Sequence, residues 1–216
     1  MTFPASCIGP SVDPILVGVD ARLWGDAEAE ILEAADRAFA EACERAPGLI
    51  ACGPGCCDCC HRPFAITEAD AERLRVGMRA LDREQAAAIE ARAAEAWGAM
   101  SADFPGEAES GHLDRSAEWR DWFYARHAGR ACPVLDPATG ACRLHAWRPV
   151  ACRLYGPLIR IGTSRSEPCP KNYVGKSAAE VEAHGVTVEL EALAEEGEQG
   201  ETVVAFALFD KRRRAV

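Results

Sequence analysis

The sequence predicts a mainly α-helical fold that contains one small β-hairpin and an irregular, cysteine-lined hub between the helices. Three observations support this prediction. Several long segments place apolar residues three or four positions apart, which is the spacing of an amphipathic helix. The segment 49–63 is too rich in cysteine, glycine and proline for regular structure. Two short apolar runs flank a Pro-Ala-Thr-Gly turn at 137–140.

The first predicted helix covers residues 26–46. Glu and Arg residues occupy the side opposite its apolar stripe, and Pro47 and Gly48 end the helix. Cys43 lies on the apolar side, where a free cysteine behaves as a small hydrophobic residue. The stripe is expected to face the core and consists of Ile31, Ala35, Phe39, Ala42 and Ala46.

A capping-box pattern marks the start of the next helix. Thr67 is followed three residues later by Asp70, so each side chain can accept a hydrogen bond from the other residue's backbone N–H. The helix that follows is rich in alanine and extends to Met100. We expect it to break near Gly77 or Asp82.

An aromatic-rich helix and the hairpin are predicted in the middle of the chain. The helix covers 113–127, and its side chains Trp119, Trp122 and Phe123 are expected to face inward. The hairpin covers 132–144, where a turn containing proline and glycine separates the two apolar runs.

The remaining elements are predicted to be short. Pro149 starts a helical turn that carries Cys152, because proline fits the first turn of a helix. A strand is expected over 157–161, followed by a helix over 177–196 with a break at its glycine. The segment 203–209 fits a strand or a helix equally well.

Composition excludes several classes of partner. The formal net charge of −10 argues against general binding to nucleic acids or anionic membranes. No segment approaches the roughly 18 consecutive apolar residues of a membrane-spanning helix. The first ten residues lack the pattern of a secretory signal, so a cytoplasmic location is predicted, where thiols stay reduced. The basic tail 211–214 is expected to be solvated.

Most of the eleven cysteines fall into two groups. The early group contains two interleaved C-x-x-C pairs, a spacing at which a tight turn directs two sulfurs to one metal ion. Neighbouring side chains leave the backbone in different directions, so the early sulfurs are not expected to converge on a single small ion. Either two metal ions bind side by side, or a polynuclear iron–sulfur cluster takes several sulfurs. The early group is Cys52, Cys56, Cys57, Cys59 and Cys60, and the later group is Cys132, Cys142, Cys152 and Cys169.

Basic residues surround the later group. Between residues 130 and 176, Arg and Lys outnumber Asp and Glu by eight to two, although the whole chain is acidic. Four thiolates on one Zn²⁺ leave a net double negative charge, which nearby cations can compensate. We therefore interpret Arg148 and Arg153 as residues that donate hydrogen bonds to the thiolates or to a nearby carboxylate.

These motifs resemble the CxxCxxCC cysteine-cluster family, also called YkgJ-like, a zinc- or iron-chelating domain. The resemblance rests on the early cysteine motif, on Cys132-Pro-Val-Leu, and on Arg148-Pro-Val-Ala-Cys152-Arg. It implies eight metal-binding cysteines, which in this chain are Cys52, Cys56, Cys59, Cys60, Cys132, Cys142, Cys152 and Cys169. The resemblance covers roughly residues 49–186, the expected metal-binding domain. We expect this domain to form one globular unit with an N-terminal segment and helix (1–48) and a C-terminal helix end with a basic tail (187–216).

The sequence departs from the family pattern at two places. The first gap of the early motif has three residues instead of two, so Cys52 and the additional Cys57 compete for one ligand position. His145 lies where the family has a Tyr-led stretch. We expect His145 to face solvent, because eight thiols already fill two tetrahedral sites.

Two functions of different classes are compatible with these residues. The leading one is a metal-binding protein whose zinc or iron ions organise a helical fold that could contact a protein partner. The alternative is an iron–sulfur enzyme that carries out redox or modification chemistry on a protein or peptide. The sequence leaves open whether there is catalysis, because it contains no G-x-G-x-x-G, P-loop, G-x-S-x-G or H-E-x-x-H motif.

Overall fold

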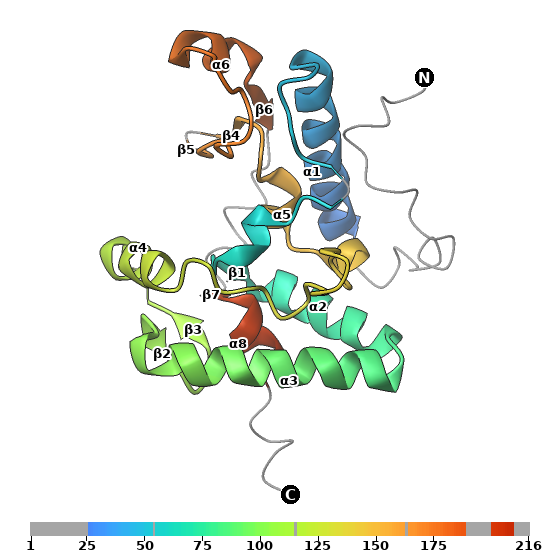
Figure 1. Ribbon diagram of the computed structural model, residues 1–216, viewed down its shortest axis with the longest axis vertical. Coiled ribbons are helices and arrows are strands. Elements are labelled where there is room, and N and C mark those ends of the chain that lie inside the picture. The colour runs from blue at the N-terminus through green and yellow to red at the C-terminus, as the bar shows by residue number, and fades with distance from the viewer. Residues whose placement is uncertain (1–25, 54, 115, 163, 189–199, 210–216) are drawn as a thin grey trace, which may run out of the picture. The chain divides into compact units, whose positions relative to one another are not determined.

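The computed structural model describes residues 26–53, 55–114, 116–162, 164–188 and 200–209. The chain forms two compact units, whose elements can be followed in Figure 1. Unit 1 consists of residues 1–56 and 150–195, and unit 2 consists of residues 57–149 and 196–216. The early cysteine group therefore contributes residues to both units.

Unit 1 is built on the long helix α1 (Asp26–Arg45), which packs against the short helix α5 (Val150–Leu154) and a small sheet. The sheet contains β4 (Ile159–Ile161), β5 (Ser164–Arg165) and β6 (Val186–Val188). The central strand β4 pairs with β5 in antiparallel and with β6 in parallel orientation.

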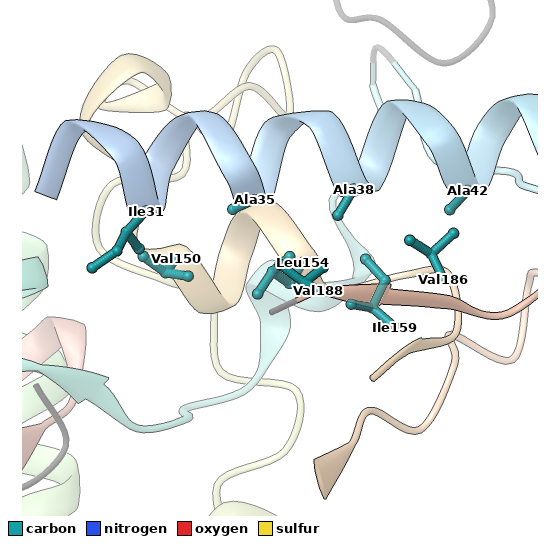
Figure 2. Close-up of a cluster of buried hydrophobic side chains, with 9 residues drawn as sticks. All are labelled: Ile31, Ala35, Ala38, Ala42, Val150, Leu154, Ile159, Val186 and Val188. Carbon is teal, nitrogen blue, oxygen red and sulfur yellow. The ribbon is translucent and has the colours of Figure 1, made fainter. Parts of the chain in front are cut away.

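The core of unit 1 lies between α1 and these shorter elements (Figure 2). Small alanine side chains recur on the inward side of α1, so neighbouring backbones can approach it closely. On the sheet, Ile159 lies opposite Val186, and each is 1% exposed. The predicted apolar stripe of the first helix is confirmed at Ile31, Ala35, Ala42 and Ala46, which are buried, whereas Phe39 is only half-buried. The cluster consists of Ile31, Ala35, Ala38, Ala42, Val150, Leu154, Ile159, Val186 and Val188.

The C-terminal part of unit 1 differs from the sequence prediction. A helix was expected over 177–196, but α6 (Ala178–His184) ends at the glycine and strand β6 follows directly. In β6, Val186 and Val188 point into the core and the residue between them is exposed. Two inward β-branched residues spaced by two favour a strand paired with β4 over a continued helix. The predicted helix from residue 189 to 196 lies outside the described residues.

Unit 2 is mainly helical. Helices α2 (Glu68–Ala80) and α3 (Arg83–Met100) follow each other, and α8 (Val204–Leu208) packs against both. α8 shows that the segment predicted as either strand or helix is helical. The other elements are helix α4 (Ala117–Arg126), the paired strands β1 (Ile66–Thr67) and β7 (Glu201–Thr202), the paired strands β2 (Gly106–Glu107) and β3 (His112–Leu113), and 3₁₀-helices at Asp58–His61, Ser101–Asp103 and His145–Trp147.

Local capping explains why the alanine-rich segment forms two helices. Thr67 and Asp70 form the predicted capping box at the start of α2, and the Thr67 hydroxyl accepts the Asp70 N–H at 3.1 Å. α2 ends at Ala80, and the side chain of Asp82 then accepts the N–H of Gln85 at 2.8 Å to start α3. The predicted break near Asp82 is therefore confirmed.

The aromatic helix α4 buries fewer rings than the sequence predicted. Phe123 is completely buried and packs edge-on against Phe104, with 5.7 Å between ring centroids. Trp119 and Trp122 are 61% and 46% exposed, so the prediction that they face inward is wrong. The two indoles contact each other, and the guanidinium of Arg126 lies 5.6 Å from the Trp122 ring. Such contacts stabilise large rings at the surface, without burial.

The predicted hairpin at 132–144 is present as a minimal antiparallel bridge between Leu135 and Cys142. The N–H of Asp136 donates to the carbonyl of Ala141 at 2.8 Å, and Gly140 has a φ of +67° in the turn. With the helices above, this confirms a mainly α fold with a small β-hairpin. None of the helices in the described part of the chain combines the length and apolar character needed to cross a membrane.

Candidate metal centre

The two units divide the cysteines predicted as metal ligands. Each unit receives members of both the early and the later group, and every described cysteine is a free thiol. Cys56 and Cys57 are neighbours in sequence but belong to different units. Unit 1 contains Cys52, Cys56, Cys152 and Cys169, and unit 2 contains Cys57, Cys59, Cys60, Cys132 and Cys142.

In unit 2, backbone hydrogen bonds join the two cysteine groups. Cys59 and Cys60 lie in the 3₁₀-helix Asp58–His61, in which the Cys60 N–H donates to the carbonyl of Cys57 at 2.9 Å. The Cys132 N–H donates to the Cys60 carbonyl at 2.6 Å, which ties the start of the hairpin to this turn. The bridge of the hairpin then brings Cys142 back beside Leu135.

The thiols of unit 2 interact with one another. A hydrogen bond with Cys60, together with burial, raises the pKa of Cys59 far above its usual range. Burial, with smaller contributions from Cys142 and Cys59, raises the pKa of Cys132 to about 12. The pKa of Cys142 is also raised, by burial and by the charge of Cys59. Burial and neighbouring thiols disfavour the ionised forms of Cys59, Cys132 and Cys142, so a cation bound beside them would favour their thiolates.

In unit 1, Cys52 and Cys169 lie in one hydrogen-bonded region. The Cys169 N–H donates to the carbonyl of Gly156 at 2.9 Å, and the Asn172 N–H donates to the carbonyl of Cys169 at 2.8 Å. The side-chain Nδ2 of Asn172 lies 3.6 Å from the Sγ of Cys52. The sulfur of Cys52 also fills the space beside Gly156, where an added Cβ would lie only 2.6 Å from it.

The other two cysteines of unit 1 lie on flanking elements. Cys152 is part of α5, one turn before Gly156, and is half-buried. Cys56 follows a tight turn in which its N–H donates to the carbonyl of Gly53 at 3.0 Å, and Gly55 adopts a φ of +83°.

The cysteines of each unit fit zinc or iron by the chemistry of their donors. Thiolates are the ligands that zinc sites and iron–sulfur centres share, and each unit has at least four thiols. In unit 1, the Cys52 sulfur packs so closely against Gly156 that a side chain at residue 156 would collide with it. Within the described residues, no group of three or more Cys, His, Asp or Glu side chains is arranged so that it could hold a metal ion.

The arginines predicted to support the thiolates have different partners. The positive charge of Arg148 acts to lower the pKa of Cys142, although burial dominates and the net pKa is raised. The guanidinium of Arg148 also contacts the ring of His145, which is exposed. Arg153 is buried in unit 1 and forms an ion pair with Asp36 of α1. Arg148 is therefore close to a thiol, whereas the ion pair of Arg153 is with a carboxylate.

Two residues of the unit 1 region were not found by sequence reasoning. Asn172 and Gly156 contact Cys52 although they lie more than 100 positions away in the chain. A Gly-Pro pair indicates only the end of a helix, and the sequence around an isolated Asn in a loop does not indicate which residues it contacts. Only the folded chain brings them to the sulfur.

A comparison with protein families identifies the cysteine region. The family model CxxCxxCC, described as "Putative zinc- or iron-chelating domain", matches residues 51–170, more than half of the chain and all eight cysteines predicted as ligands. No curated protein and no solved structure matches the chain significantly. On the strength of the family match, the chain belongs to the CxxCxxCC family of zinc- or iron-chelating domains.

Proposed function

We propose that the protein binds two metal ions, zinc or iron, through one set of four thiolates in each unit. The observation that carries this proposal is the clustering of the unit 2 cysteines: the Cys59 and Cys60 thiols share a hydrogen bond, and the Cys132 N–H donates to the Cys60 carbonyl at 2.6 Å. The unit 2 set is Cys59, Cys60, Cys132 and Cys142, and the unit 1 set is Cys52, Cys56, Cys152 and Cys169.

The residues of each set join segments that are far apart in the chain. In unit 2, Cys60 belongs to a 3₁₀-helix and Cys132 to the hairpin, and a backbone hydrogen bond of 2.6 Å already joins the two. A bound divalent ion would supply positive charge that stabilises the thiolates and adds a cross-link between these segments.

The proposed role is non-catalytic. Four thiolates complete a tetrahedral site and leave no position for substrate, which is the arrangement of structural zinc sites. The charge of Arg148 beside Cys142 favours the thiolate form of that ligand. Metal binding would therefore contribute directly to the stability of the fold.

The test is metal analysis combined with a visible absorption spectrum of protein purified without oxygen. We expect about two zinc or iron ions per chain, bound tightly enough to survive gel filtration. Cys43→Ala is the matched control, because Cys43 is a buried thiol on α1 outside both sets and its loss should leave the metal content unchanged. Protein that contains no stoichiometric metal would contradict the proposal. Stoichiometric sulfide with brown colour would instead indicate a polynuclear iron–sulfur cluster.

A further inference from the structure

The side chain of Asn172 is a buried polar group beside a proposed metal ligand. Asn172 is only 6% exposed, and both ends of its amide have partners. Oδ1 accepts the backbone N–H of Ala51 at 2.8 Å, and Nδ2 lies 3.6 Å from the Sγ of Cys52. A buried amide must satisfy both its donor and its acceptor, so these two contacts account for its position.

Hydrogen bonds on both sides hold this amide in place. The Asn172 N–H donates to the carbonyl of Cys169, and the next N–H, of Tyr173, donates to the carbonyl of Leu49 at 2.8 Å. The segment that follows Cys169 is thereby tied to the segment that precedes Cys52. Oδ1 accepts the Ala51 N–H and lies 3.9 Å from the Cys52 Sγ, whereas Nδ2 lies nearer to that sulfur, at 3.6 Å. A thiolate can only accept, so the ionised form of Cys52 would take its hydrogen bond from Nδ2.

Gly156 also packs closely against the Cys52 sulfur. A Cβ at residue 156 would lie 2.6 Å from the Cys52 Sγ and 3.5 Å from the Asn172 Nδ2. Gly156 also has a φ of +125°, a conformation that side-chain-bearing residues rarely adopt. The Cys52 sulfur thus lies between an amide donor and a backbone position kept free of side-chain atoms.

We infer that Asn172 is a positioning residue that donates an N–H···S hydrogen bond to Cys52 and thereby makes Cys52 the ligand in unit 1. This inference rests on the proposed function, because it assigns a role towards the metal that Cys52 would bind. It also decides between Cys52 and Cys57 for the disputed ligand position. Cys52 contacts Asn172 and Gly156 within unit 1. Cys57 belongs to unit 2, where four other cysteines are already available as ligands.

The test uses Co²⁺ as a spectroscopic substitute in the full chain. Asn172→Asp keeps an oxygen to accept the Ala51 N–H but replaces the donor to sulfur with a carboxylate oxygen. We expect Co²⁺ affinity to fall about 10- to 100-fold at one of two sites, as for other residues that support metal ligands. The sulfur-to-cobalt charge-transfer band of that site should move to longer wavelength, because a sulfur without its hydrogen bond is more electron-rich.

Two further variants separate positioning from general stability. Asn172→Ala should give the same band shift without the added charge, and it replaces the Asp variant if that variant does not fold. In a Cys52→Ala background, which should bind one Co²⁺, Asn172→Asp should have no additional effect on metal binding. An additive effect there would overturn the inference, since Asn172 would then act through some other residue.

The remaining outcomes distinguish this inference from the proposed function. Wild-type protein that binds no Co²⁺ would overturn both. Wild-type protein that binds two Co²⁺ ions, with unchanged affinities and spectra in the Asn172 variants, would overturn only the role of Asn172. Loss of one ion in Cys57→Ala but not in Cys52→Ala would overturn the choice of ligand, and the reverse result would support it.

Discussion

Gly156 is the residue at which packing around the proposed ligands is tightest. A side chain there would collide with the Cys52 sulfur and would also have to adopt a φ of +125°. We expect Gly156→Ala to lower the free energy of unfolding by about 2–5 kcal/mol, the sum of backbone strain and overpacking. Urea denaturation of the metal-free protein measures this loss.

Gly175→Ala is the matched control for backbone strain. Gly175 lies in the same unit with a φ of +80°, and nothing lies within 4 Å of an added Cβ. Its loss should cost only about 1–2 kcal/mol. Equal losses of unfolding free energy in the two variants would show that the Cys52 sulfur does not prevent a side chain at residue 156.

The raised pKa values of the unit 2 thiols predict a pH dependence of metal binding. Cys132, with a pKa raised to about 12, is protonated in the free protein at neutral pH, and Cys59 and Cys142 shift in the same direction. Metal binding must therefore release protons, so the apparent affinity rises with pH. Competition titrations with Co²⁺ at pH 6.5 and 7.5 should differ by more than about tenfold. An affinity independent of pH would contradict this account of the site.

At the scale of elements, α3 offers a test of packing in unit 2. Ala93 is completely buried, whereas Ala91 on the same helix is exposed. Ala93→Leu should lower the free energy of unfolding by about 1–3 kcal/mol, because a larger side chain overpacks the core. Ala91→Leu should change it by less than about 0.5 kcal/mol, since both residues favour helices and the site is on the surface. Thermal or urea melts measure both changes. Equal losses of stability in the two variants would contradict the position of Ala93 in the core of unit 2.

Helix ends were predictable from the sequence because their causes are local. The Thr67 capping box forms as predicted, and the predicted break near Asp82 coincides with an Asp82 N-cap; each cap depends on a residue three positions away. The strand at 186–188 depends on pairing with β4, almost thirty residues earlier. The exposure of Trp119 likewise depends on which part of α4 meets the core. Contacts of this kind have no local signature.

At the scale of the whole molecule, the sequence predicted the donors but not their grouping. The motif identified the cysteines, and the family match covers them. The division of neighbouring Cys56 and Cys57 between two units follows from long-range contacts, such as the hydrogen bond from Cys132 to Cys60. Sequence order suggests one early hub, whereas the fold distributes its residues over two units.

Metal removal should destabilise the protein as a whole. A ligand that binds only the folded state adds its binding free energy to folding, about 2.7 kcal/mol at a concentration 100 times its dissociation constant. For a chain of this size we expect chelation to lower the melting temperature by more than about 5 °C, measured by circular dichroism. A melting temperature unchanged by chelation would show that the sites do not support the fold.

The proposal that the chain holds two separate thiolate sites can be tested by native mass spectrometry after exposure to a competing chelator. We predict two metal ions in the wild-type chain and in Cys43→Ala, and one ion in either Cys142→Ala or Cys169→Ala. The double variant Cys142→Ala/Cys169→Ala should retain none. Loss of all metal in either single variant would contradict the claim, because it would mean that the two sets of sulfurs share one centre.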